Sequence, residues 1–318
     1  VQHLKKKYGK NLALDDLSFT IEKGQIYGFL GPNGAGKSTT MNIMTGYISA
    51  TSGEVLIDGH SILDEPEKAK KSIGYLPEIP PLYLDMTVME YLKFVAELKK
   101  IPKDKRSAEV RKASTLVKLN DVSNRLIRNL SKGYKQRTGL AAAVLGFPDI
   151  IILDEPTVGL DPKQIIEIRQ LIRKLAKDHT VILSSHILAE VQEICDYVLI
   201  ISKGKLVGSG TPEELEELSH GKDSIELTVK SDADTIQSVL DRIDGIQNVT
   251  WKNQGADSCD LLVDTSKSAQ EVCEDISIAF ATERIPVTRI NILKATLEDI
   301  FLELTESSQK DEEGETKR

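Results

Sequence analysis

The chain has 318 residues, 40% of them hydrophobic and 28% charged, with 41 Lys and Arg against 49 Asp and Glu and a net charge of −8. This length suggests about two domains of ordinary globular composition, and three cysteines without metal-type or paired spacing indicate a reducing compartment. No apolar run approaches the ~18–20 residues that a bilayer-spanning helix needs, so we expect that the chain does not cross a membrane by itself.

Residues 1–219 alternate short β-branched runs with helical patterns, which predicts an α/β domain. The strands expected in its sheet are Ile26–Leu30, Ile150–Leu153, Val181–Ser184 and Val198–Ile201. The run Ile150–Leu153 is apolar throughout, as expected for a strand that is buried on both faces. Between Pro80 and Arg128 apolar residues recur at helical intervals, which predicts an inserted helical subdomain at about residues 80–130.

A glycine-rich segment follows the first of these strands. Residues 31–39 read Gly-Pro-Asn-Gly-Ala-Gly-Lys-Ser-Thr and fit the P-loop pattern G-x-x-x-x-G-K-[ST]. The glycines of this pattern let backbone N–H groups turn toward a polyphosphate, and the next helix presents its positive N-terminus. Lys37 is expected to bridge the β- and γ-phosphates, and the Ser38 hydroxyl to ligate Mg²⁺. The residues expected to bind the nucleotide here are Asn33, Gly34, Gly36, Lys37, Ser38 and Thr39.

Two carboxylates follow the buried strand Ile150–Leu153. Given the P-loop upstream, Asp154 is predicted to hold Mg²⁺ and Glu155 to accept a proton from the attacking water. A polar cap at the end of a strand is the alternative interpretation, and the P-loop makes it the weaker one. These two motifs predict a nucleotide hydrolase and no narrower class.

Three further motifs occur in a recognisable order. Residues 130–137 read Leu-Ser-Lys-Gly-Tyr-Lys-Gln-Arg, residues 159–161 read Gly-Leu-Asp, and residues 184–186 read Ser-Ser-His. They resemble the signature motif, the D-loop and the switch histidine of ATP-binding-cassette (ABC) ATPases. The resemblance covers about residues 1–219 and implies an ABC cassette with P-loop NTPase fold, acting as the nucleotide-binding subunit of a transporter.

This resemblance also implies the chemistry and the partners. It implies hydrolysis of ATP with Mg²⁺, in a homodimer or a heterodimer with a paralogue, that drives membrane subunits encoded separately. Ser131 and Gly133 of one copy would complete the nucleotide site of the other, beside Asp161. His186 would contact the γ-phosphate, and Tyr8 would stack on adenine. The expected location is cytoplasmic, peripheral on the inner face of the plasma membrane.

Two departures from the commonest family pattern narrow the resemblance. Glu78 stands where most members carry glutamine, and its carboxylate is expected to offer an oxygen to Mg²⁺ or to water in the catalytic site. Lys132 and Tyr134 replace Gly and Gln of the usual Leu-Ser-Gly-Gly-Gln signature. Both departures resemble the branch of gliding-motility, daunorubicin-resistance and ABC-2-type exporter ATPases, which implies export of a lipid, drug, peptide or polymer.

Basic side chains are concentrated at residues 99–112. A solvated helix-and-loop face is the favoured interpretation of such a run. Contact with anionic lipid headgroups near a membrane partner is the alternative.

The C-terminal part is predicted to form a smaller α+β domain at residues 220–306. The expected order is a ferredoxin-like βαββαβ followed by a helix at Leu297–Leu304, and residues 307–318 are expected to be a disordered tail. Residues 220–306 hold 8 basic and 17 acidic side chains, a net −9, whereas residues 1–219 hold 30 and 28, a net +2. The acidity therefore belongs to the C-terminal domain and argues against a nucleic-acid partner.

Two other classes of function fit these motifs less well. Soluble ABC ATPases of translation usually carry two cassettes, and those of DNA repair insert long coiled coils between P-loop and signature. This chain has one P-loop, and the 94 positions from Lys37 to Ser131 leave room only for the helical subdomain. A nucleotide sensor without hydrolysis is disfavoured because Glu155 and His186 are both present.

Overall fold

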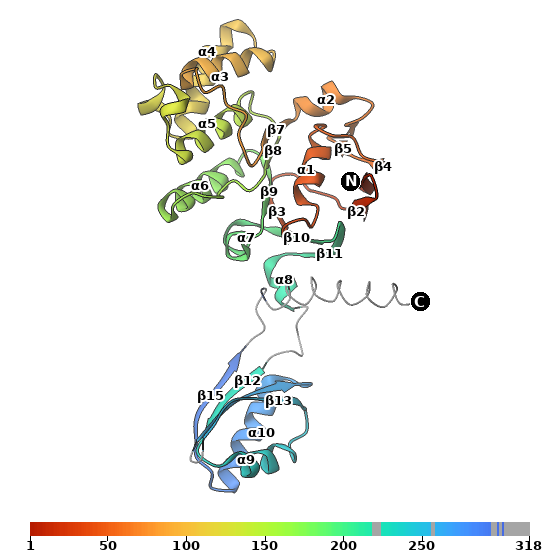
Figure 1. The fold of residues 1–318 in the computed structure, drawn as a ribbon, viewed down its shortest axis with the longest axis vertical. Coiled ribbons are helices and arrows are strands. Elements are labelled where there is room, and N and C mark those ends of the chain that lie inside the picture. Colours follow the sequence, from red (N-terminus) through yellow and green to blue (C-terminus); the bar gives the residue numbers. More distant parts are fainter. Residues whose placement is uncertain (218–223, 256–257, 294–297, 299–300, 302–318) are drawn as a thin grey trace. The chain divides into compact units, whose positions relative to one another are not determined.

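The computed structural model describes residues 1–217, 224–255, 258–293, 298 and 301 (Figure 1). Contacts divide the chain into two compact units, one containing Val1–Pro212 and the other Glu213–Glu303. Within the part that the structure describes, no helix is both long enough and apolar enough to span a bilayer.

The first unit is built around a six-stranded sheet with the strand order β11-β10-β3-β9-β8-β7. The neighbours from β10 to β7 pair in parallel, and β11 pairs antiparallel with β10 at one edge. The α/β prediction is confirmed, and all four predicted strands lie in this sheet, whereas β7 and β11 are additional strands. The members are β3 (Ile26–Leu30), β7 (Ile73–Leu76), β8 (Ile150–Leu153), β9 (Thr180–Ser185), β10 (Tyr197–Ser202) and β11 (Lys205–Gly210).

A second, antiparallel sheet with the order β2-β1-β4 belongs to the same unit. It consists of β1 (Gln2–Tyr8), β2 (Asn11–Leu17) and β4 (Ser52–Glu54), and the hairpin β5 (Leu56–Ile57) and β6 (His60–Ser61) and helix α2 (Pro66–Lys71) follow. A common hydrophobic core joins the two sheets through helix α1 (Lys37–Met44). Buried members of this core include Leu4, Leu17, Phe29, Met41, Ile152 and Ile182.

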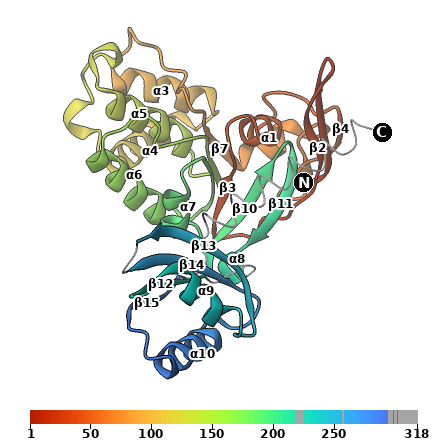
Figure 2. The same ribbon diagram turned by 60° about the horizontal axis from the view of Figure 1, so that its bottom comes forward.

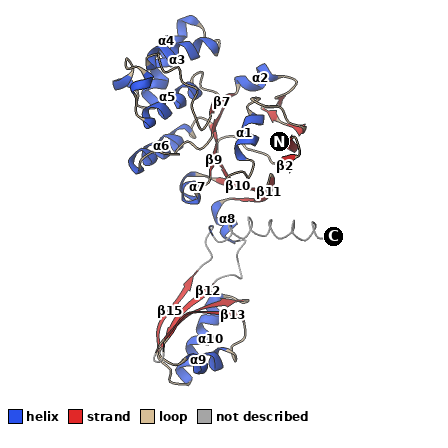
Figure 3. Ribbon diagram, in the orientation of Figure 1, coloured by secondary structure: helices blue, strands red, loops and turns tan. Residues whose placement is uncertain are grey.

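Helices cover both faces of the parallel sheet. Helix α1 lies on one side, and α6 (Pro162–Leu175) and α7 (Leu188–Ile194) lie on the other (Figures 1 and 3). The start of α6 is fixed by Asp161, whose Oδ1 accepts a hydrogen bond from the N–H of Gln164 at 3.0 Å, and Pro162 occupies the first helical position. The carboxyl ends of the parallel strands are thereby left for loops, which carry the polar motifs.

The predicted helical subdomain is present as a cluster of helices beside the sheet (Figure 1). It contains α3 (Val88–Leu98), α4 (Lys103–Leu116), α5 (Lys132–Val144) and two short 3₁₀ helices at Asn120–Val122 and Ile127–Asn129. A capping box begins α3, since Thr87 Oγ1 accepts from the N–H of Glu90 and the Glu90 carboxylate accepts from the N–H of Thr87.

Lys99 is an exposed residue of the basic run 99–112, and its ammonium makes specific contacts within the fold. Its Nζ donates to the carbonyl oxygens of Ala143 at 2.8 Å and Leu145 at 2.7 Å, at the C-terminal end of α5. A cation at this position satisfies carbonyls that lack helical partners and offsets the negative end of the helix dipole. Lys99 therefore attaches the end of α3 to the helix that carries the signature motif.

Gly74 in β7 determines how closely helix α5 approaches the sheet. A Cβ atom at this position would lie 2.3 Å from the carbonyl oxygen of Ala143 and 3.0 Å from Pro148 Cγ. The Gly74→Ala variant is expected to lower the free energy of unfolding by about 1–3 kcal/mol, because a well-packed contact would have to open. Urea unfolding measures this, and an unchanged midpoint with an unchanged slope would contradict it.

The second unit holds a four-stranded antiparallel sheet with the order β13-β14-β12-β15. Two helices lie on one of its faces (Figure 2). Its core includes Leu227, Leu261, Val272, Ile276 and Phe280. The elements are α8 (Pro212–Glu217), β12 (Ser224–Val229), α9 (Ala233–Leu240), β13 (Ile246–Gln254), β14 (Cys259–Thr265), α10 (Ala269–Thr282) and β15 (Val287–Leu293). The predicted helix Leu297–Leu304, except Glu298 and Phe301, and the predicted tail 307–318 lie outside the described residues.

Candidate functional site

The P-loop connects β3 to α1 and depends on Gly36 for its shape. Gly36 has a φ of 110° and precedes the first residue of α1. A Cβ atom there would lie 2.6 Å from Leu14 Cδ2 and 2.9 Å from the carbonyl oxygen of Ala13, so both backbone conformation and space require glycine. The loop therefore lies directly against β2, and helix α1 begins where the loop ends.

Lys37 is held inside this loop. The residue is buried, and its Nζ donates to the carbonyl oxygens of Gly31 at 2.7 Å and Pro32 at 3.3 Å. The carboxylate of Glu155 lies 3.7 Å from the same nitrogen. Burial lowers the pKa of the Lys37 ammonium, and the charge of Glu155 opposes that shift. Backbone carbonyl groups of the P-loop therefore hold the ammonium at the position where phosphates would meet the loop.

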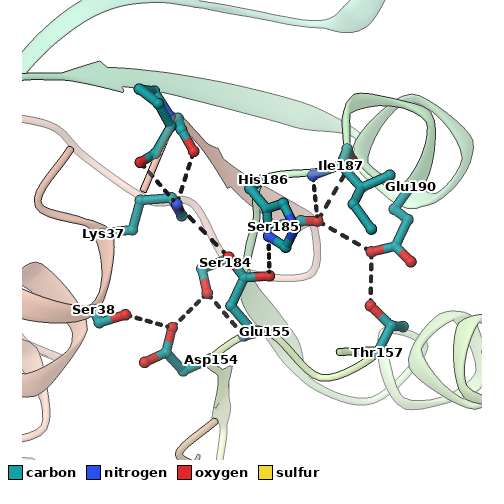
Figure 4. Close-up of polar contacts among 12 residues, drawn as sticks. Lys37, Ser38, Asp154, Glu155, Thr157, Ser184, Ser185, His186, Ile187 and Glu190 are labelled. Carbon is teal, nitrogen blue, oxygen red and sulfur yellow. Dashed lines mark hydrogen bonds and ion pairs between the residues drawn. The ribbon is translucent and has the colours of Figure 1, made fainter. Parts of the chain in front are cut away.

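Asp154 lies at the end of β8 and connects three segments (Figure 4). Its Oδ1 accepts hydrogen bonds from the Ser38 hydroxyl at 3.0 Å and from the Ser184 hydroxyl at 2.6 Å. Ser184 Oγ in turn accepts the backbone N–H of Glu155 at 2.9 Å. Since Asp154 is buried, these contacts fix its carboxylate beneath Ser38.

Glu155 and His186 form a direct pair. The Nδ1 atom of His186 lies 3.0 Å from Glu155 Oε2, and the histidine side chain is 41% exposed whereas that of Glu155 is 8% exposed. Glu155 has a φ of 47°, a left-handed conformation that is costly for a glutamate and is kept here by its N–H bond to Ser184. With this backbone conformation, the buried carboxylate of Glu155 faces both Lys37 and the accessible imidazole of His186.

These groups surround one cavity of about 320 Å³. Its walls include the predicted nucleotide-binding residues Asn33, Gly34, Gly36, Lys37, Ser38 and Thr39, together with Glu78, Glu155 and His186. A cavity with backbone N–H groups, one lysine and a helix N-terminus suits a polyphosphate.

The oxygen ligands fit Mg²⁺ in part. The Ser38 hydroxyl and the Asp154 carboxylate touch each other at 3.0 Å, and Glu78 is an exposed residue of the same cavity wall. The described residues contain no group of three or more His, Cys, Asp and Glu side chains that could hold a metal by themselves. This donor set matches Mg²⁺, which usually takes one or two protein oxygens and completes its shell with phosphate and water.

Five predicted site residues do not line this cavity, and one of them, Asp154, lies directly behind the cavity wall through its hydrogen bond with Ser38. Tyr8 is 48% exposed at the end of β1, where Lys6 Nζ lies 5.0 Å from its ring centroid. Ser131 caps α5, since its side chain accepts the N–H of Tyr134 at 3.4 Å, and Gly133 is buried in the first turn. Asp161 caps α6. Within a single chain, the structure therefore brings together the P-loop, Asp154, Glu155, Glu78 and His186, and leaves the signature and D-loop residues elsewhere.

The signature and the D-loop contact each other. A Cβ atom on Gly133 would lie 2.5 Å from Gln164 Oε1, and one on Gly159 would lie 2.0 Å from Lys132 Nζ. The Tyr134 hydroxyl donates to Asp121 Oδ2 at 2.9 Å. Both residues that depart from the usual signature thus have local contacts, and the turn of α5 at Ser131 is kept.

Three residues of this region have roles that sequence patterns do not reveal. Ser184 connects Asp154 to the backbone of Glu155, and Thr157 Oγ1 donates to the buried carboxylate of Glu190 at 2.7 Å. Each partner lies about thirty positions away in the chain, so spacing alone cannot identify it. The only available signal is that two serines end a fully buried strand.

Comparison with curated proteins gives relatives along nearly the whole chain. The family profile described as ABC transporter matches residues 14–158. The uncharacterized ABC transporter ATP-binding protein YhcH of Bacillus subtilis is 36% identical over 307 residues, 96% of this chain and 92% of the relative. The linearmycin resistance ATP-binding protein LnrL of the same species is 31% identical over 98% of this chain and 99% of its own length. The bacitracin transport ATP-binding protein BcrA of Bacillus licheniformis is 41% identical over 64% of this chain and 66% of its own length.

Solved structures resemble the first part of the chain. The ATP binding subunit of an ABC transporter matches with a TM-score of 0.63 and 29% identity, over 69% of this chain and 92% of its own. A dimeric ATP-binding cassette in a post-hydrolysis state, bound to ADP and Pi, matches with a TM-score of 0.61 and 26% identity, over 66% and 97%. YhcH, LnrL and BcrA carry names of transport or resistance, and none of these three carries a name of translation or repair.

Proposed function

This chain belongs to the ABC transporter family as an ATP-binding subunit, and we propose that its ATP hydrolysis drives export through membrane subunits encoded separately. The observation that carries the proposal is the single cavity that joins Lys37 and Ser38 to Glu155 and His186. The names of relatives in bacitracin transport and linearmycin resistance support an exported peptide or antibiotic-like compound.

In this proposal each residue of the cavity has a separate role in ATP hydrolysis. Lys37 exchanges its carbonyl contacts for the β- and γ-phosphates, where its charge stabilises the transferring phosphoryl group. Glu155 accepts the proton of the attacking water, and the position of its carboxylate matters more than its basicity, because phosphoryl transfer depends mainly on positioning and electrostatics. His186 reaches the γ-phosphate from the exposed side of the Glu155 pair.

Ser38, Asp154 and Glu78 are the residues that would hold Mg²⁺, which supplies positive charge next to the phosphates. Asn33, Gly34, Gly36 and Thr39 contribute to the phosphate cradle in the same proposal. Tyr8 supplies a stacking surface for adenine.

A second copy of the chain, or a paralogue, completes the site. Ser131 and Gly133 begin helix α5 and do not line the cavity of their own chain. The start of a helix binds anions, so in a symmetric dimer the signature of one copy faces the γ-phosphate held by the other, with Asp161 beside the interface. The dimeric cassette with ADP and Pi supports this arrangement.

The domain limits and location follow as parts of the proposal. Residues 1–219 form the ATPase domain, with the helical subdomain at about 80–130, and residues 220–306 form an accessory domain followed by the tail 307–318. The chain is cytoplasmic and lies on the inner face of the plasma membrane, and nucleic acid is not a partner.

Glu78 is expected to tolerate glutamine. The Glu78→Gln variant keeps a side-chain oxygen at the cavity wall, so its ATPase rate should stay within about threefold of wild type. Glu78→Ala, which lacks that oxygen, should lose more activity and need more Mg²⁺. The rates are measured as phosphate release across a Mg²⁺ titration. Loss of Mg²⁺-dependent activity in Glu78→Gln would show that the charge of the carboxylate is required.

Purification from native membranes tests the proposed coupling to transport. The chain, carrying an affinity tag, is expected to co-purify with one or more integral membrane proteins after mild detergent extraction. Recovery without any integral membrane protein would instead favour a soluble ATPase.

A further inference from the structure

We propose that Glu190, on helix α7, is a positioning residue that keeps Glu155 and His186 at a fixed position relative to each other. It does so from outside the cavity. It acts on two loops, the one after β8 that carries Glu155 and the one after β9 that carries His186. The inference rests on the proposed roles of Glu155 and His186.

One carboxylate oxygen of Glu190 joins the two loops. Glu190 Oε2 accepts hydrogen bonds from Thr157 Oγ1 at 2.7 Å and from Ser185 Oγ at 3.1 Å (Figure 4). Ser185 Oγ also accepts the N–H of Ile187 at 3.0 Å, so the Ser185 hydroxyl is itself fixed in the turn.

The hydroxyls of Thr157 and Ser185 lie close in the chain to Glu155 and His186, so the bridge through Glu190 can affect the position of these two residues. Thr157 follows Glu155 by two residues, and Ser185 directly precedes His186. In front of the bridge, Glu155 and His186 are themselves joined at 3.0 Å. The two loops are thus connected twice, once at the cavity and once at Glu190, which lies on the far side of the pair from Lys37 (Figure 4).

The bridging carboxylate of Glu190 is buried and has a basic neighbour. Glu190 is 3% exposed, and its second oxygen, Oε1, has no hydrogen-bond partner in the described part of the chain. Arg169 Nη2 of helix α6 lies 3.6 Å from that oxygen. A buried carboxylate needs a compensating charge, and Arg169 supplies one and ties the bridge to the helix that starts at Asp161.

Loss of the bridge should affect turnover more than nucleotide binding. In Glu190→Ala the Glu155 and His186 loops lose their common anchor, and displacements of about 1 Å at reacting groups cost up to about 100-fold in rate. We expect kcat to fall at least about tenfold, with the KM for ATP within about twofold of wild type. Glu190→Gln keeps an accepting oxygen for both hydroxyls and should recover kcat to within about threefold.

Two further variants separate this role from a merely structural one. Thr157→Val removes one bonded hydroxyl at nearly constant shape, and the Thr157→Val/Glu190→Ala double variant should be no slower than Glu190→Ala alone, because both changes break the same link. Glu193→Gln is the matched control, since Glu193 lies on the same helix and pairs with Arg169 and Arg173 but touches neither loop. It should keep the wild-type kcat.

The assays are steady-state phosphate release, equilibrium ATP binding and thermal unfolding, on the full chain. A wild-type kcat in both Glu190→Ala and Thr157→Val overturns the proposal, as does a loss in Glu193→Gln equal to that in Glu190→Ala. If Glu190→Ala fails to fold, a wild-type kcat in Thr157→Val decides against the bridge and a reduced kcat with unchanged KM supports it. Glu155→Gln in the same assays identifies failure of the proposed function itself, because full activity of that variant would remove the premise.

Discussion

The Glu155→Gln variant is expected to bind ATP with near wild-type affinity and to hydrolyse it about 100- to 10,000-fold more slowly, the range for loss of a general base. The amide has almost the same shape, so the strained backbone at φ 47° and its bond to Ser184 are kept. What disappears is the ability to accept a proton and the charge that faces Lys37 at 3.7 Å and His186 at 3.0 Å.

Phosphate release and equilibrium ATP binding measure this outcome separately. Glu67→Gln is the matched control, because Glu67 is an exposed carboxylate that pairs with Lys100 outside the site. Its rate should equal that of wild type. A Glu155→Gln variant that hydrolyses at the wild-type rate would remove Glu155 from the reaction.

The Lys37→Ala variant is expected to bind ATP about 100-fold more weakly, since a charge-assisted hydrogen bond contributes up to about 3 kcal/mol. Lys37 is the one lysine or arginine among the described residues that line the cavity, and it lies at the start of α1 where phosphates would contact the loop. Its loss also leaves the buried Glu155 carboxylate without its lysine partner, which adds repulsion toward an anionic ligand.

A second lysine provides the control for this change. Lys70 Nζ donates to the carbonyl oxygen of Gly46 at 3.0 Å, the same kind of bond that Lys37 makes, but outside the cavity. Lys70→Ala should leave ATP affinity unchanged. Isothermal titration with ATP measures both variants, and wild-type affinity in Lys37→Ala would contradict a phosphate site at this loop.

The parts of the fold that sequence predicts are those with strong local patterns. A few neighbouring residues are enough to predict the strands Ile26–Leu30 and Ile150–Leu153 and the P-loop between strand and helix. The structure contains all three as expected. Strand β1 contains three consecutive lysines, and β4 is exposed throughout. Neither strand therefore shows the alternation of apolar and polar residues from which a strand is predicted. Their strand conformation comes from pairing with each other and with β2, which is long-range information.

The same distinction holds for the site. Motifs identify Lys37, Ser38, Asp154, Glu155 and His186, and the structure places all of them together. Ser184 contacts Asp154, and Glu190 contacts Thr157, about thirty residues away in the chain, and Lys99 contacts carbonyls more than forty residues away. Local sequence patterns therefore do not reveal these contacts. Such contacts depend on how strands β8 and β9 and helices α3 and α5 pack, which no single window of sequence contains.

In the composite site that we propose, two copies enclose ATP between the P-loop of one and the signature of the other. Light scattering on Glu155→Gln with and without ATP is the decisive measurement, alongside the double variant Glu155→Gln/Ser131→Glu. Glutamate is compatible with the N-terminus of α5 but repels a phosphate held by the partner.

We predict that ATP shifts Glu155→Gln from the monomer mass of 35.2 kDa to twice that mass. The double variant should still bind ATP and should remain a monomer. If Glu155→Gln binds ATP and stays monomeric, or if the double variant dimerises just as well, the composite site is contradicted.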